Sequence, residues 1–129
     1  MYKILGYLSS ALLGLLFAPY LLRVINKKFL NDDPKIKSVV RSLKKIHPIV
    51  GLTFAVISLF HGYSALGGFR LHTGSLVYGM AVIAIIFGAM FSVKKKKQYL
   101  IMHKSFTAMT FILWTVHILF PSALYYLFN

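Results

Sequence analysis

Four histidines are the residues of this chain whose type and spacing most favour chemistry. They form two pairs of equal spacing, His47 with His61 and His103 with His117. A separation of fourteen residues on an α-helix corresponds to roughly 21 Å of rise and falls about 40° short of four full turns, so both members of a pair share one face. Because roughly 21 Å fits inside a hydrocarbon core of about 30 Å, each pair offers one imidazole towards each side of a membrane.

These residue types at this spacing favour axial ligation of haem b. Imidazole is rare in lipid, where a polar residue is a functional candidate by default. Haem b needs two axial imidazoles on opposite faces of a flat macrocycle. The less favoured alternatives are a transition-metal or proton-relay site and histidines that only pack between helices. A structural zinc ion takes four ligands, whereas the chain has no cysteine and only two acids, Asp32 and Asp33.

Four apolar stretches are long enough to position these histidines in a bilayer. We expect spans at about 4–22, 46–66, 74–93 and 98–127, which together use most of the 129 residues. With 58% hydrophobic and 13% charged residues, the chain does not resemble an ordinary soluble domain. The predicted fold is therefore all-α, an integral membrane four-helix bundle in a single domain over residues 1–129.

The segment between the first two spans also has a helical pattern. Asp32 and Asp33 precede Pro34, a combination typical of a capped helix start with proline at the first helical position. Apolar residues then repeat at helical spacing through residues 34–46, with basic residues mostly on the other faces. We expect a short amphipathic helix on the cytoplasmic membrane surface that leads into the second span.

The net charge of +13 is concentrated in two places. Of 15 Lys and Arg residues, eight lie between Arg23 and Lys45, and five lie between Lys94 and Lys104. This is the positive-inside pattern and suits anionic lipid headgroups, so nucleic acid is not expected as a partner. We expect the basic loops in the cytoplasm and both termini outside, in a prokaryotic plasma membrane. A basic docking face for an acidic redox partner is compatible with the same pattern.

The predicted topology decides which histidines pair. The spans at 46–66 and 98–127 both run from inside to outside, so they are parallel. His47 and His103 then share the inner depth, and His61 and His117 share the outer depth. We predict that the first two ligate the iron of an inner haem and the last two that of an outer haem, with the two haems stacked across the bilayer.

Further residues are candidates for packing against the haems, and they are Gly51, Gly74, Gly88, Phe54 and Trp114. The small residues leave room for porphyrin or, equally, permit close helix packing. Phe54 is expected between the haems, and Trp114 is either a haem wall or an interfacial anchor. His72 breaks the pattern. We expect it on the surface of the outer loop, with a proton or substrate contact beside the outer haem as the alternative.

The paired H-x13-H motifs at residues 47–61 and 103–117 resemble the di-haem core of cytochrome b from quinol-oxidising complexes. They are also similar to the transmembrane domain of the ferric reductase and NADPH oxidase family. The resemblance covers roughly residues 43–127 and implies a four-helix haem core with the four histidines as axial ligands. The chain departs from these families in having four expected spans rather than six or eight, and no flavin- or nicotinamide-binding domain.

The expected function is transmembrane electron transfer through two b haems. The donor would be quinol or a cytoplasmic-side protein, and the acceptor ferric iron, an oxygen species, quinone or an external redox protein. The alternatives are a haem-containing anchor subunit of a larger oxidoreductase and a small non-haem transporter. Membrane lipid is the other expected partner, and a homo-oligomer is compatible with the pattern.

Overall fold

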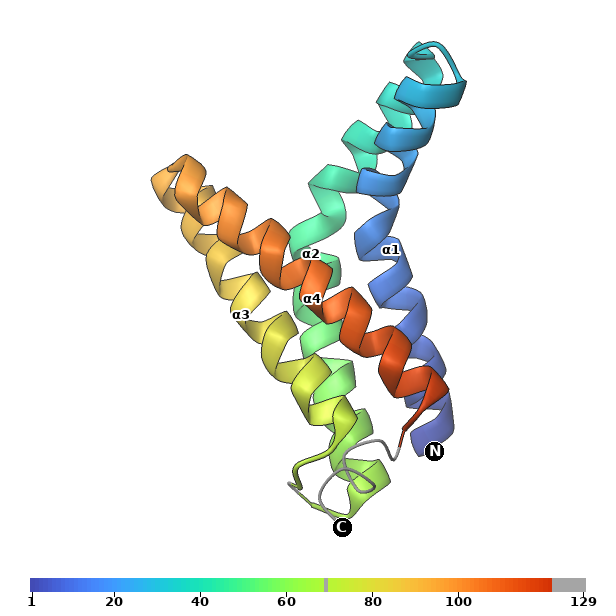
Figure 1. Ribbon diagram of the computed structural model, residues 1–129, viewed down its shortest axis with the longest axis vertical. Helices are drawn as coiled ribbons and strands as arrows, with labels where there is room; N and C mark the ends of the chain where they lie inside the picture. The colour runs from blue at the N-terminus through green and yellow to red at the C-terminus, as the bar shows by residue number, and fades with distance from the viewer. Residues whose placement is uncertain (69, 122–129) are drawn as a thin grey trace. The chain divides into compact units, whose positions relative to one another are not determined.

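The computed structural model describes residues 1–68 and 70–121, in which every regular element is a helix. The helices are α1 (Tyr2–Phe29), α2 (Pro34–Leu66), α3 (Thr73–Lys94) and α4 (Lys97–Leu119) (Figure 1). They fall into two compact units, Met1–His61 and Gly62–Asn129. The prediction of an all-α chain with four helices is confirmed, whereas the single domain over the whole chain stays a prediction.

Three of the helices, α1, α2 and α3, are long and apolar enough to cross a membrane. Their large apolar side chains are widely exposed, as in Ile4 at 71%, Ile49 at 69% and Ile86 at 51%. Such surface is unfavourable in water and is usual in contact with lipid. α4 does not qualify within the described residues, because Lys104 and the two histidines interrupt its apolar run, so the fourth span stays a prediction.

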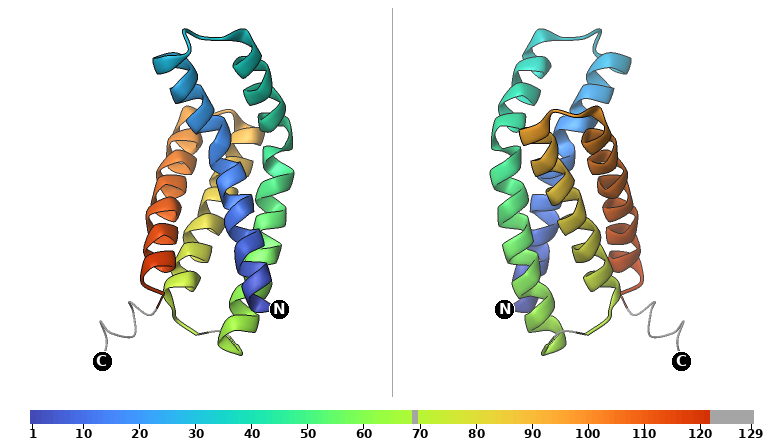
Figure 2. Two further views of the ribbon diagram at one scale, coloured as in Figure 1. Left: turned by 90° about the vertical axis from the view of Figure 1, so that its right-hand side faces the viewer. Right: turned by 90° about the vertical axis from the view of Figure 1, so that its left-hand side faces the viewer.

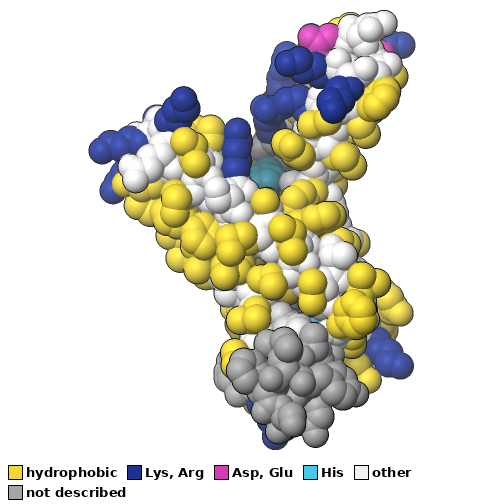
Figure 3. All heavy atoms as spheres, in the orientation of Figure 1, with side chains coloured by type: hydrophobic (Ala, Val, Ile, Leu, Met, Phe, Trp, Pro, Cys, Tyr) yellow, Lys and Arg dark blue, Asp and Glu magenta, His cyan; other side chains and the backbone are white. Residues whose placement is uncertain are grey.

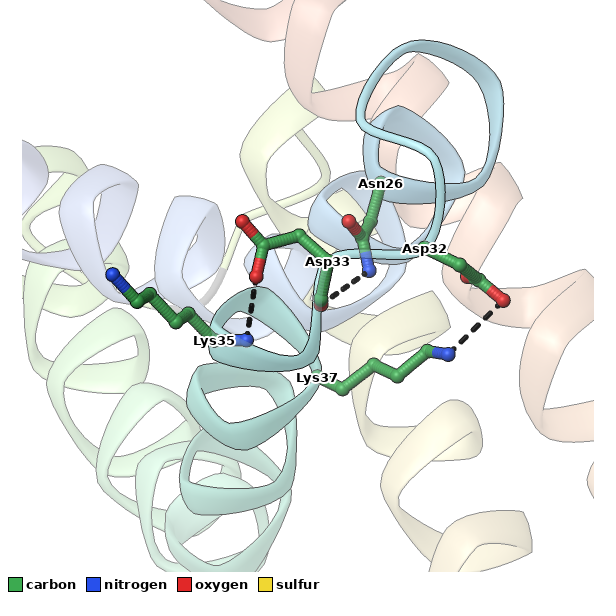
Figure 4. A network of polar contacts seen from close by, with 5 residues as sticks. All are labelled: Asn26, Asp32, Asp33, Lys35 and Lys37. Carbon is green, nitrogen blue, oxygen red and sulfur yellow. Dashed lines mark hydrogen bonds and ion pairs between the residues drawn. The ribbon is translucent and has the colours of Figure 1, made fainter.

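α1 and α2 form an antiparallel hairpin whose turn is held by capping contacts (Figures 2 and 4). The Asp33 side chain accepts a hydrogen bond of 2.7 Å from the backbone N–H of Lys35. Pro34 follows as the first helical residue, as the sequence predicted. Asn26, which is only 3% exposed, donates from Nδ2 to the Asp33 carbonyl oxygen at 3.1 Å. The end of α1 is thereby attached to the start of α2.

The helix predicted to start at Pro34 is present, but it is longer than the short helix that we expected at residues 34–46. α2 is continuous from Pro34 to Leu66, with Pro48 inside it, and α1 continues past the predicted span to Phe29. Val40 lies on the segment and is buried, at 7% exposed. Val40 therefore packs within the first unit, whereas Val39 and Ile46 are exposed. The location of this segment at a membrane surface stays a prediction.

Replacing Asp33 by alanine should destabilise the first hairpin by about 1 kcal/mol, because the Lys35 N–H in the first turn of α2 loses its side-chain acceptor. The free energy of unfolding, measured in detergent by circular dichroism, is the readout. Asp33→Asn should keep most of the stability, since the amide oxygen can also accept. Equal stability of the alanine and asparagine variants would contradict this role.

α3 and α4 form the second hairpin around a turn of two residues. α3 ends at Lys94, and Lys95 takes a left-handed conformation at φ 54°, with its N–H bonded to the Phe91 carbonyl oxygen at 2.9 Å. Phe87 stacks on Phe106 with ring centroids 5.6 Å apart. The short turn and this stacked pair hold α3 and α4 antiparallel.

The last helix ends earlier than the predicted span. α4 stops at Leu119, and Phe120 and Pro121 are outside the helix. Proline disfavours the helical conformation of the residue before it, which accounts for a break at this point. The remaining predicted positions, 122–127, lie outside the described residues.

Candidate functional site

The four predicted histidines lie on two helices. His47 and His61 are on α2, and His103 and His117 are on α4. Neither helix is interrupted between the two members of its pair, so the expected rise of roughly 21 Å along each helix holds. All four side chains are half-buried.

His103 lies against α3. Its Nδ1 is 2.8 Å from the carbonyl oxygen of Ala84, and a Cβ added to Gly88 would lie 3.0 Å from the same nitrogen. Because a carbonyl oxygen can only accept, Nδ1 carries the proton and the lone pair of the neutral ring is on Nε2. A side chain at position 88 would crowd the imidazole, so glycine favours this close approach.

His61 makes the same contact with α1. Its Nδ1 is 2.9 Å from the carbonyl oxygen of Tyr2, and a Cβ on Gly6 would lie 2.9 Å from its Cε1. As with Ala84 and Gly88, the accepting carbonyl belongs to the residue one turn before the glycine. A helical side chain covers the turn N-terminal to it, so glycine uncovers that carbonyl for a ring N–H from the neighbouring helix.

His117 also carries its proton on Nδ1, but its acceptor is a side-chain hydroxyl rather than a backbone carbonyl. Its Nδ1 is 2.8 Å from the hydroxyl of Thr73, and that hydroxyl donates its one hydrogen to the carbonyl oxygen of Pro121 at 2.7 Å. The threonine oxygen must therefore accept from Nδ1 of the histidine. A Cβ on Gly74 would lie 3.1 Å from Cε1 of this ring, so glycine again gives the imidazole its space.

His72 is more than the surface residue that we expected. It is the N-cap of α3, where its Nδ1 accepts from the Gly74 N–H at 3.3 Å and its backbone N–H bonds to the Ser75 hydroxyl at 2.8 Å. Its ring meets the His117 ring edge-on, with centroids 5.6 Å apart and an angle of 88° between planes. His72 therefore fixes the start of α3 beside His117.

The remaining predicted packing residues have mixed surroundings. Gly51 is buried, and a Cβ on it would meet only Leu16 of α1, at 3.9 Å. Phe54 is buried, at 4% exposed. Trp114 is half-buried, with its ring 5.5 Å from that of Phe111 on the same helix. Their predicted contacts with haem stay predictions.

Sequence reasoning missed the acceptors of the three rings and the role of Gly6. The sequence did not decide whether Gly74 and Gly88 make room for porphyrin or for close helix packing. In the structure, the two glycines make room for the rings of His117 and His103. A signal was present in the sequence. In the second hairpin, Gly88 and Gly74 precede the end of α3 by as many residues as His103 and His117 follow the start of α4, which places each glycine opposite its histidine in an antiparallel hairpin.

The predicted pairing of His47 with His103 and of His61 with His117 takes one residue from each unit, so it stays a prediction. Within residues 1–68 and 70–121, no group of three or more His, Cys, Asp or Glu side chains gathers in a way that could hold a metal ion. A bis-imidazole haem site requires only two protein ligands.

Comparisons with known proteins identify no family. The chain matches no protein-family model, no curated protein and no solved structure. The case for a function therefore rests on the histidines and on the contacts around them.

Proposed function

We propose that this chain is a membrane cytochrome that transfers electrons across a bilayer through two b-type haems. In this proposal, the helices form a four-helix bundle with both termini outside and the basic turns in the cytoplasm. His47 and His103 would hold the inner haem, and His61 and His117 the outer one. When bound, haem b supplies a centre that gains and loses one electron.

The observation that carries the proposal is the shared position of Nδ1 in His61, His103 and His117, which in each ring lies 2.8–2.9 Å from an oxygen atom. Each donates Nδ1–H to an oxygen of the neighbouring helix in its own unit, which leaves Nε2 as the basic nitrogen. Metal-ligating histidines almost always donate their other N–H to an oxygen in this way, which fixes the ring and raises its basicity. A ring held in this way presents Nε2 as the nitrogen that can bind iron.

The chemistry of the donor set fits haem better than a bare metal ion. The only acidic side chains of the chain are Asp32 and Asp33, and both lie in or next to the turn between α1 and α2. Each proposed site then has two neutral imidazoles and no carboxylate, too few ligands for a structural zinc ion. Porphyrin supplies the four equatorial nitrogens, so two imidazoles complete the coordination.

Two imidazoles at each site also favour electron transfer over chemistry at the metal. The chain would supply both ligands that the haem iron takes from the protein, which would leave no position for a substrate. In a bilayer, the apolar helices would keep water away from the ligands. The contacts of His61, His103 and His117 hold the orientation of these three rings. The donor in this proposal is quinol or a protein on the cytoplasmic side, and the acceptor lies on the opposite side.

Reconstitution into sealed vesicles tests the proposal. With ascorbate trapped inside and ferricyanide outside, the wild-type protein should reduce ferricyanide faster than protein-free vesicles do. Haem-depleted protein should be inactive. Haem-loaded protein that gives only the rate of empty vesicles would contradict electron transfer and favour a haem-containing anchor.

The Thr73 hydroxyl offers a specific prediction, because it accepts from His117 and is buried, at 6% exposed. Thr73→Val should weaken retention of the outer haem by about 10–100-fold, the usual effect of losing such an outer contact of a ligand. Haem transfer to apomyoglobin measures the retention, and the inner haem serves as the internal control. Thr73→Ser should restore it. A serine variant as weak as the valine variant would contradict the role of the hydroxyl.

A further inference from the structure

A stripe of basic side chains runs along one face of α2 before the predicted membrane span. Lys37, Arg41 and Lys44 are spaced by four and three residues, so they share a helix face. All three are exposed, and Lys44 is one turn before His47. We refer to these three residues as the basic stripe. It lies in the hairpin end where Figure 3 shows Lys and Arg side chains gathered around the turn.

The acids of this region do not neutralise the basic stripe. Asp33 uses its carboxylate to cap α2 through the Lys35 N–H. Asp32 pairs with Lys37 at 3.0 Å, and the two side chains are 62% and 51% exposed (Figure 4). Exposed ion pairs of this kind contribute little. Arg41 and Lys44 are exposed, and Lys37 can leave Asp32 to pair with an acidic group of a partner.

The length of the helix argues against phospholipid as the main occupant. Residues 34–45 rise roughly 18 Å at 1.5 Å per residue, and they precede the predicted span at 46–66. The headgroup layer adds only about 5–7 Å on each side of the hydrocarbon core. Lipid phosphates would therefore reach Lys44 at the base of the stripe but not Lys37 near its outer end.

We propose that the basic stripe docks an acidic, soluble electron-carrier protein. The proposal rests on the function proposed above and names the cytoplasmic-side partner. A row of exposed positive charges attracts an acidic surface, raises the association rate and orients the carrier. A carrier that contacts the whole stripe lies alongside α2 and within one turn of His47, the histidine assigned to the inner haem.

A binding measurement that does not depend on haem tests the proposal. The protein is placed in nanodiscs of phosphatidylcholine, and its affinity for an acidic plant-type ferredoxin is measured by interferometry. The test variant is Lys37→Gln/Arg41→Gln/Lys44→Gln. The matched control is Lys94→Gln/Lys96→Gln/Lys97→Gln, which removes the same charge from exposed residues of the other hairpin. At low salt, the stripe variant should bind at least about tenfold more weakly, while the control should change by less than about twofold.

Several results would overturn the docking proposal. The wild type could fail to bind the ferredoxin, or both variants could lose the same affinity for it. The basic stripe could also bind phosphatidylglycerol vesicles or single-stranded RNA more tightly than it binds the ferredoxin. The haem content of the same nanodiscs separates the two proposals. If the protein contains haem but does not bind the ferredoxin, the docking proposal is wrong and the proposed function stands. If the protein takes up no haem, the proposed function is wrong.

Discussion

Replacing His103 by leucine is expected to remove one of the two haems, and replacing His47 should remove the same one. The proposal assigns both residues to a single inner site, and leucine offers no lone pair to iron. The His47→Leu/His103→Leu double variant should therefore lose no more haem than either single variant. The His47→Leu/His61→Leu variant removes the same number of histidines, but it takes one from each site and should therefore lose both haems. Pyridine haemochrome assays of the purified proteins give the haem content per chain.

This set of variants tests the pairing itself. His72→Asn is the control, because asparagine can still cap α3 and no ligand role is assigned to position 72. It should keep both haems. Complete haem loss in the His47→Leu/His103→Leu variant, or haem loss in the His72→Asn variant equal to that of His103→Leu, would contradict the assignment.

Replacing Gly88 by valine is expected to weaken inner haem binding by about 10–100-fold without any change to a ligand. The new Cβ would lie 3.0 Å from Nδ1 of His103, a distance that forces the ring to move. We expect this movement, together with the bulk of the two valine methyl groups, to weaken the hydrogen bond to the Ala84 carbonyl oxygen, so that the position and tautomer of the imidazole are less firmly held. Haem retention and the low-spin electron paramagnetic resonance signal of the inner haem are the measurements.

The chain provides matched controls for this prediction. A Cβ on Gly79, which lies on the same helix as Gly88, would meet no atom within 4 Å. Gly79→Val should therefore bind both haems normally. On α1, Gly6→Val should weaken the outer haem through His61, whereas Gly14→Val should not, since space around Gly14 is also open. Equal effects within either pair would show that general helix packing is responsible.

The helices were predictable because their signals are local. Apolar runs of sufficient length, Asp33 before Pro34, and the lysines at 94–97 indicated where helices begin and end. The histidine pairs were visible because fourteen residues is close to a whole number of helical turns. We expected only a short helix at residues 34–46, because the amphipathic pattern of this segment differs from the apolar pattern of the span that follows. Such a change of pattern does not show whether one helix continues through both segments.

The details around the histidines were not predictable from such local signals. The acceptors of His61 and His103 are backbone carbonyls of Tyr2 and Ala84, and every residue has a carbonyl. Which one is uncovered depends on a glycine one turn further on and on the register between two helices. The Thr73 contact additionally requires Pro121 to take the hydroxyl hydrogen, which follows only from the three-dimensional arrangement.

The absorption spectrum of the protein purified from haem-replete cells tests the central claim most directly. The account predicts two b-type haems per chain and, on reduction with dithionite, a split α band from two bis-imidazole sites in different surroundings. A colourless protein, or one whose haem content is unchanged when all four histidines are replaced, would contradict it.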